Sequence, residues 1–165
     1  MWKGPSAGQT ALYDAILDSL HILDMGRQAK KTLIVISDGG DNISTHSFKD
    51  VMEAVLASRA TIYTVGIFDT DDPDRNPDVL KKLANVSGGV AYFPEKPRDV
   101  IDICRQIAKD IRSRYTMAYV PHDLDRPGVR HIKIEAASPD RGRLIARTRT
   151  SYIVPSMQAA DRRTK

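Results

Sequence analysis

Hydrophobic residues along the chain follow two patterns, one with helical spacing and one of short continuous runs. The first predicted helix spans residues 10–23, with apolar side chains at every third or fourth position, at Leu12, Ile16, Leu20 and Leu23. Residues 32–36 then form a nearly continuous apolar run, which predicts a strand that is buried on both faces.

The two patterns go on alternating as far as residue 113. Ser47 is a candidate N-cap, and Asp50 three residues later makes a variant of the capping box. In chain order the predicted elements are a helix after Ser47, a strand over 61–68, a helix over 77–86, a strand over 90–93 and a helix over 98–113. Such alternation predicts a parallel sheet with helices on both faces.

Beyond residue 113 apolar and polar residues alternate with period two. The alternation covers 115–120, 131–136 and 144–149, and turn-forming residues fill 138–142. This pattern predicts antiparallel strands with one face in solvent.

The length of 165 residues fits one domain with a sizeable core. We expect an α/β domain over residues 1–113, a β extension over 114–155 that packs on or beside it, and a disordered polar tail over 156–165.

Composition excludes several classes of protein. The net charge is +4, but the basic residues are dispersed and do not interleave with aromatic residues, so a nucleic-acid partner is not expected. No apolar run approaches the roughly 18 residues of a membrane span, and no signal peptide is recognised. The single cysteine, Cys104, excludes an internal disulfide and lies in an apolar helical row, where an inert core thiol is expected.

Two oxygen-bearing side chains are predicted to meet at one edge of the sheet. Asp38 follows the strand 32–37, and Thr10 precedes the first helix. Ligands bind at the carboxyl ends of parallel strands, and Mg²⁺ or Mn²⁺ accepts such oxygens together with waters. A plainer alternative is that Thr10 caps its helix and Asp38 supports a turn. The predicted ligand-binding rim around them consists of Gly8, Gln9, Gly39, Gly40 and Asp41.

Other chemistry finds little support. The acidic loop 69–76 lacks the glycine and the closing glutamate of a calcium loop, and the four histidines are scattered. A receiver-like domain phosphorylated at Asp38 would need an acidic pair on a neighbouring strand end and an opposing lysine, and neither is found. We therefore do not expect an enzyme.

Three segments in the order 8–12, 34–39 and 63–67 resemble successive landmarks of the von Willebrand factor A (vWA) domain. The extension 115–155 is similar to the β tail of a bacterial branch of this family. The resemblance implies a Rossmann-like parallel sheet flanked by helices, of which residues 1–113 would be the C-terminal portion. It also implies a non-enzymatic protein-binding or adhesion module. Family members often act outside the cytoplasm.

The same resemblance assigns a metal-ion-dependent adhesion site, in which Thr10 would bind Mg²⁺ or Mn²⁺ directly and Asp38 through water. The family's other ligands lie in an Asp-x-Ser-x-Ser loop, which does not occur in these 165 residues. Either this chain is a fragment of a longer protein or the site has lost its function. Because Mg²⁺ demands an octahedral set of oxygens, we expect this incomplete site to hold the ion only weakly.

The family's sheet places another strand beside the one that matches 32–37, and no segment of this chain matches that neighbour. An open, apolar edge is therefore expected at Leu33, Ile34, Val35 and Ile36. We expect this edge to be covered in one of three ways: by the C-terminal hairpin, by strand addition from a second copy, or by exchange of elements between copies. The alternative function is thus metal-independent assembly through this edge.

Overall fold

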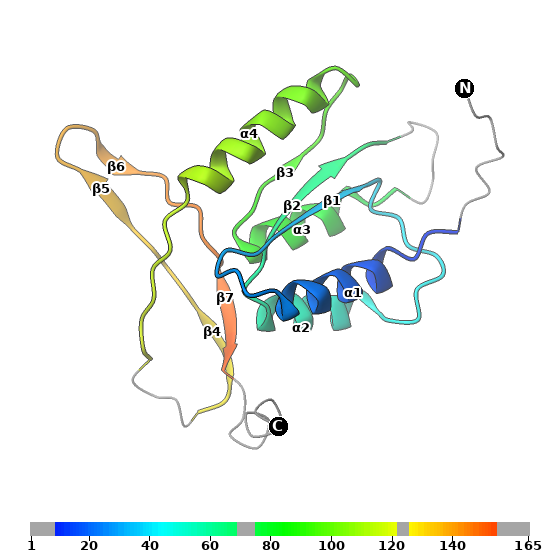
Figure 1. The fold of residues 1–165 in the computed structure, drawn as a ribbon, viewed down its shortest axis with the longest axis horizontal. Coiled ribbons are helices and arrows are strands. Elements are labelled where there is room, and N and C mark those ends of the chain that lie inside the picture. The colour runs from blue at the N-terminus through cyan, green and yellow to red at the C-terminus, as the bar shows by residue number, and fades with distance from the viewer. Residues whose placement is uncertain (1–8, 69–74, 122–125, 155–165) are drawn as a thin grey trace.

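Three parallel strands form the centre of the fold, in the order β1–β2–β3 (Figure 1). They are β1 (Thr32–Ser37), β2 (Thr61–Gly66) and β3 (Ala91–Tyr92). Thr32 lies beside Thr61 in the register of β1 and β2. The computed structural model describes residues 9–68, 75–121 and 126–154, so the tail predicted over 156–165 lies outside the described residues.

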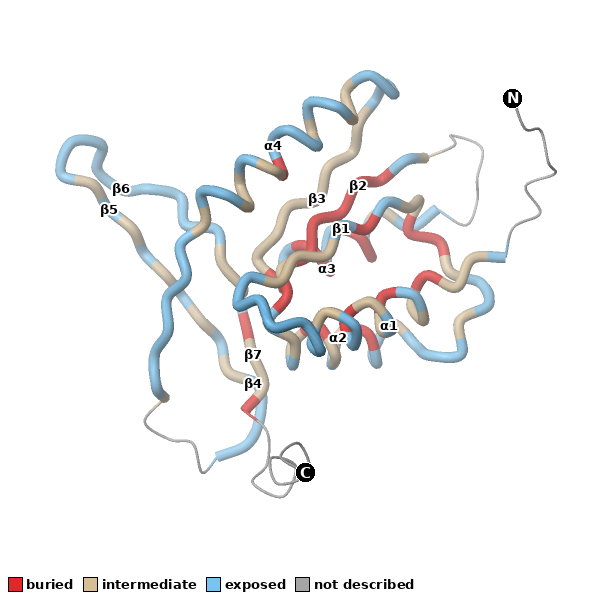
Figure 2. Tube along the Cα trace, in the orientation of Figure 1, coloured by how far each residue is buried: buried red, intermediate tan, exposed pale blue. Residues whose placement is uncertain are grey.

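Four helices cover the two faces of this sheet. They are α1 (Leu12–Met25), α2 (Phe48–Ala57), α3 (Pro77–Ser87) and α4 (Asp99–Ser113). Helices α1, α2 and α3 pack with Val35 and Ile62 on one face. Helix α4 packs through Ile107 against Tyr63 and Val65 on the other face (Figures 1 and 2). The predicted mixed α/β architecture with helices on both faces is confirmed. No helix in the described ranges is long and apolar enough to cross a bilayer.

Local sequence signals set several helix ends. The Ser47 side chain accepts the Asp50 N–H, and the Asp50 carboxylate accepts the Ser47 N–H, so the predicted capping box is present. Helix α3 starts at Pro77 behind an Asn76 cap and ends at Gly88, whose φ of 82° is left-handed.

Strand β1 is not buried on both faces, so this prediction is wrong. Leu33 and Val35 pack into the core that β1 shares with α1, but Ile34 is 46% exposed and Ile36 is 57% exposed. The reason is that β1 pairs with β2 only and has no second neighbour within the described ranges. Helix α4 covers the matching positions of β2, which leaves the isoleucines of β1 uncovered.

The C-terminal extension forms two short antiparallel pairs. Strand β4 (Gly128–His131) pairs with β7 (Ser151–Val154), and β5 (Ala136–Ser138) pairs with β6 (Gly142–Leu144). The antiparallel extension and the turn within 138–142 are therefore confirmed, but the alternating segments 131–136 and 144–149 are strand only at their ends, at His131, Ala136 and Leu144, so these two strand predictions are wrong in their bounds. None of these strands pairs with β1, so the predicted cover by the C-terminal hairpin is wrong.

Two further predictions are wrong in this half of the chain. Residues 115–120 alternate in polarity but form no strand, and Tyr115 is 91% exposed. Alternation makes a strand only where a neighbouring edge supplies hydrogen bonds. Cys104 is exposed rather than a core thiol, because α4 buries the row through Ile103, Ile107 and Ile111.

Candidate functional site

The loop that follows β1 lies at the carboxyl ends of the parallel strands and is hydrogen-bonded to the N-terminal end of α1. The Asn42 N–H donates to the Thr10 carbonyl at 3.0 Å, and the Thr10 N–H donates to Asn42 Oδ1 at 2.7 Å. Asn42 follows Asp38 by four residues. The backbone of Thr10 is therefore tied to the loop that begins at Asp38.

Asp38 supports the turn through only one of its carboxylate oxygens. Asp38 Oδ1 accepts the Gly40 N–H at 2.9 Å and the Ser37 hydroxyl at 3.3 Å. The Asp38 carbonyl accepts the N–H of Asn76, the cap of α3, at 2.9 Å. Asp38 Oδ2 has no hydrogen-bond partner among the residues described. The turn-supporting role is thus confirmed for Asp38 Oδ1.

Thr10 does not cap helix α1, so this alternative is wrong. The N-cap position is Ala11, and the helix receives its capping groups from the distant loop instead. Asp41 Oδ1 accepts the Tyr13 N–H at 3.0 Å, and the Ser44 hydroxyl oxygen accepts the Asp14 N–H at 3.1 Å. The Thr10 hydroxyl has no hydrogen-bond partner in the described part of the chain.

The remaining residues of the predicted rim differ in burial and in hydrogen bonding. Gly39 and Gly40 are buried, whereas Gln9 is exposed. Asp41 is committed to α1 and also accepts the Ser44 hydroxyl at 2.5 Å. Gly8 lies outside the described residues. Whether these residues bind a ligand stays a prediction.

A polar cluster around Asp14, next to this loop, was not predicted from the sequence. The Asp14 carboxylate accepts the N–H of Thr45 at 2.9 Å and the N–H of His46 at 3.1 Å, and His46 Nδ1 lies 2.7 Å from Asp14 Oδ1. The Thr45 backbone donor, followed by the His46 side chain, lowers the pKa of Asp14 to about 2. Asp14 and His46 are 32 residues apart in sequence, so no local spacing could have indicated the pair.

This pKa predicts an acid-dependent loss of stability. Because the folded chain lowers the Asp14 pKa from 3.8 to about 2, deprotonated Asp14 stabilises the fold above pH ~4. That contribution should fade as the pH falls from about 4 to about 2. Asp14→Asn should lower the urea midpoint at pH 7 and flatten its dependence on pH in this window.

Asp18→Asn is the matched control, since it removes the same charge from the same helix at an exposed position. Asp18 makes no hydrogen bond or ion pair within the described ranges. Its urea midpoint should follow the wild-type pH curve. Parallel curves for Asp14→Asn and the wild type would contradict the proposed role of Asp14.

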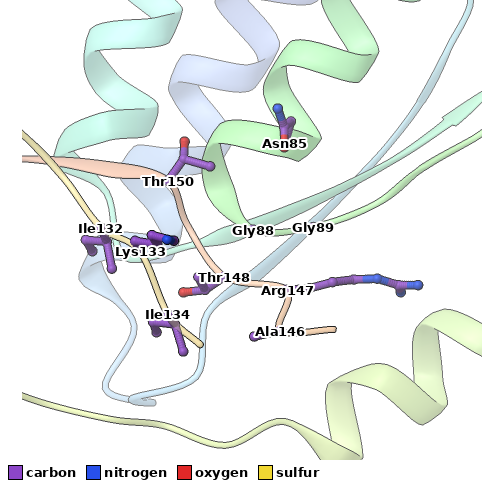
Figure 3. Close-up of a pocket in the computed structure, with 10 residues that line it drawn as sticks. All are labelled: Asn85, Gly88, Gly89, Ile132, Lys133, Ile134, Ala146, Arg147, Thr148 and Thr150. Carbon is purple, nitrogen blue, oxygen red and sulfur yellow. The ribbon is translucent and has the colours of Figure 1, made fainter. Parts of the chain in front are cut away.

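A separate hollow of about 300 Å³ lies between the end of α3 and the C-terminal segments (Figure 3). It is lined by Asn85, Gly88, Gly89, Ile132, Lys133, Ile134, Ala146, Arg147, Thr148 and Thr150. Its two cations are already engaged, Lys133 with Glu135 at 2.8 Å and Arg147 with Asp110 at 3.8 Å. Gly89 lies close to the start of β2, because a Cβ added there would lie 1.9 Å from the carbonyl oxygen of Ile62. Asp38 follows the opposite, carboxyl end of the neighbouring strand β1, so the hollow is not part of the Asp38 site.

Thr10 and Asp38 are the predicted ligands of a metal ion at this end of the sheet. In the described residues, no group of three or more His, Cys, Asp and Glu side chains is arranged to hold a metal ion. Thr10 and Asp38 therefore offer two oxygens, and any ion there would need further oxygens from water or a partner. The chain matches no protein-family model, no curated protein and no solved structure.

Proposed function

We propose that this chain is a non-enzymatic protein-binding module of the vWA type, which uses the Thr10 and Asp38 end of its sheet as the contact surface. One observation carries the proposal: the loop after Asp38 is hydrogen-bonded to the backbone of Thr10. In addition, the Thr10 hydroxyl and Asp38 Oδ2 are without partners among the described residues. Two oxygens without a described partner, at the carboxyl end of a parallel sheet, suit a ligand contact.

The residues fit a divalent cation only in part. Thr10 would bind Mg²⁺ or Mn²⁺ directly and Asp38 would hold it through water, as the resemblance implies. Mg²⁺ prefers six oxygens in an octahedron, so two protein side chains leave the remaining positions to water and to an acidic group of the partner. Affinity for the ion alone should therefore be weak, on the order of the 10⁻³ M typical of the weakest calcium modules.

Titration calorimetry with Mg²⁺ and then Mn²⁺ tests the metal contribution. The wild-type chain should give a weak binding heat, and Asp38→Ala should abolish it. Asp18→Ala is the control, since Asp18 is an exposed carboxylate on α1, and it should keep the wild-type heat. Absence of binding heat in the wild type, or equal heats in wild type and Asp38→Ala, would refute metal binding at this site.

A second candidate function is metal-independent assembly through the β1 edge. The observation that favours it is that β1 has a paired neighbour on one side only within the described ranges, with Ile34 and Ile36 exposed. Edges of this kind readily pair with strands of another chain. This function needs neither Thr10 nor Asp38 as a ligand, so it does not depend on the calorimetric result.

A further inference from the structure

The open edge of β1 presents three residues whose main-chain groups have no partner among the described residues. The carbonyls of Lys31 and Ser37 face β2, where they accept hydrogen bonds from Thr61 at 3.0 Å and Ile67 at 3.2 Å. Main-chain groups alternate in direction along a strand, so the odd-numbered residues of β1 face β2. Thr32, Ile34 and Ile36 therefore point their N–H and C=O groups outward, and they have no hydrogen-bond partner in the described part of the chain.

The residues of β1 include none of the types that usually protect an edge strand. Strand β1 contains no charged residue, no proline and no glycine. Its outward residues include two isoleucines about half exposed, Ile34 and Ile36. A strand that pairs here would gain hydrogen bonds and also bury apolar surface.

The charges that flank β1 favour a second copy of the same strand in antiparallel orientation. Lys30 and Lys31 precede the strand, and Asp38 follows it. Lys31 is paired with Asp24 at 3.3 Å, so the net positive charge at the strand start is that of Lys30, whose Nζ donates to the neutral Arg114 carbonyl at 3.1 Å. Antiparallel pairing of two copies would place the basic start of each strand beside the acidic end of the other. Parallel pairing would bring like charges together, which is unfavourable across neighbouring strands.

We propose that two copies of this chain pair through β1 about a two-fold axis at Ile34, which would join their sheets into one. Ile34 then lies opposite Ile34 of the second copy, and Thr32 lies opposite Ile36 of the second copy. All outward groups are used, because three residues on each strand form about six hydrogen bonds. Lys30 of one copy lies opposite Asp38 of the other at both ends.

A two-fold axis at Val35 is the competing register, and it is less favourable. The pleat requires that residues opposite each other share a face, so the axis must pass through one residue and not between two. With the axis at Val35, Thr32 would lie opposite Asp38 of the second copy. Asp38 cannot continue the ladder, because its carbonyl already accepts the Asn76 N–H at 2.9 Å.

This inference rests on the second proposed function, assembly through the edge, and adds the partner and the register. Light scattering should give twice the chain mass of 18.3 kDa for the wild type. Ile34→Lys should halve that mass, because two lysines would face each other at the axis. Ile145→Lys is the control at a residue that is 92% exposed, and it should keep the wild-type mass.

Cysteine cross-linking tests the register in a Cys104→Ser background, which removes the only native cysteine. Directly opposed residues in a hydrogen-bonded pair have Cα atoms about 5.5 Å apart, within the range of a disulfide. Ile34→Cys should therefore form a covalent dimer on oxidation. Ile36→Cys should not, because its two copies would lie four residues apart along the strands, about 13 Å.

The outcomes separate the inference from the function on which it rests. A wild-type monomer overturns both, and so does a dimer that survives Ile34→Lys, because assembly would then use another surface. A dimer that Ile34→Lys dissociates but Ile34→Cys does not cross-link keeps edge assembly and overturns the pairing at Ile34. A cooperative thermal unfolding transition of Ile34→Lys, starting from the helical circular dichroism of the wild type, shows that the substitution leaves the fold intact; its midpoint should lie lower, because the dimer no longer stabilises the native chain.

Discussion

A Gly39→Ala chain is expected to unfold at a far lower urea concentration than the wild type. Gly39 has a φ of 82°, and a Cβ at this position would lie 2.1 Å from the backbone carbonyl oxygen of Asn76. The left-handed conformation alone costs a residue with a side chain about 1–2 kcal/mol. The clash is with backbone, so relief requires the loop after β1 to separate from the start of α3. That movement would also break the hydrogen bond from Asn76 to the Asp38 carbonyl.

Gly142→Ala separates the conformational cost from the clash. Gly142 also has a positive φ, of 66°, but an added Cβ would meet nothing within 4 Å. This control should lose only about 1 kcal/mol of unfolding free energy. Equal losses for the two substitutions would show that the loop yields easily and that the Gly39 contact does not hold the Asp38 site in place.

The second large effect is expected for Ile62→Ala, near the start of β2. Ile62 is 0% exposed and packs in the core cluster shared with α1, α2 and α3. Removal of a fully buried isoleucine side chain beyond Cβ typically costs about 2–5 kcal/mol, because transfer free energy is lost and a cavity remains. Urea unfolding monitored by circular dichroism would measure this loss.

Ile145→Ala deletes the same atoms from a side chain that is 92% exposed. Its unfolding free energy should stay within about 0.5 kcal/mol of the wild type. A small loss for Ile62→Ala, similar to that of Ile145→Ala, would mean that the cluster around β2 is not the core of the folded chain.

Local elements of this fold follow directly from the sequence. Ser47 and Asp50 form a capping box, and Pro77 starts α3, because these signals involve residues within one helical turn. The order of strands and helices also follows, since helical and strand periodicity differ and alternate down to residue 113. The general rule for parallel sheets was enough to select the end of β1 as the candidate site.

Groupings of distant residues follow only from the tertiary structure. The Asp14 and His46 pair joins α1 to a loop 32 residues away, and neither position carries a distinctive local pattern. Similarly, Asp41 rather than Thr10 caps α1, because capping depends on which polar group the folded loop brings to the helix N-terminus.

Burial is the property that the sequence by itself left undecided. The apolar run of β1 and the alternation over 115–120 both predict strands, yet Ile34 and Tyr115 are exposed. An apolar pattern determines which conformation a segment favours, whereas burial and ladder pairing depend on a neighbour that the pattern does not contain. The sequence thus determined the helices, the central strands and their order. The tertiary structure decided which edge of the sheet remains open, because that depends on which segments come to lie beside it.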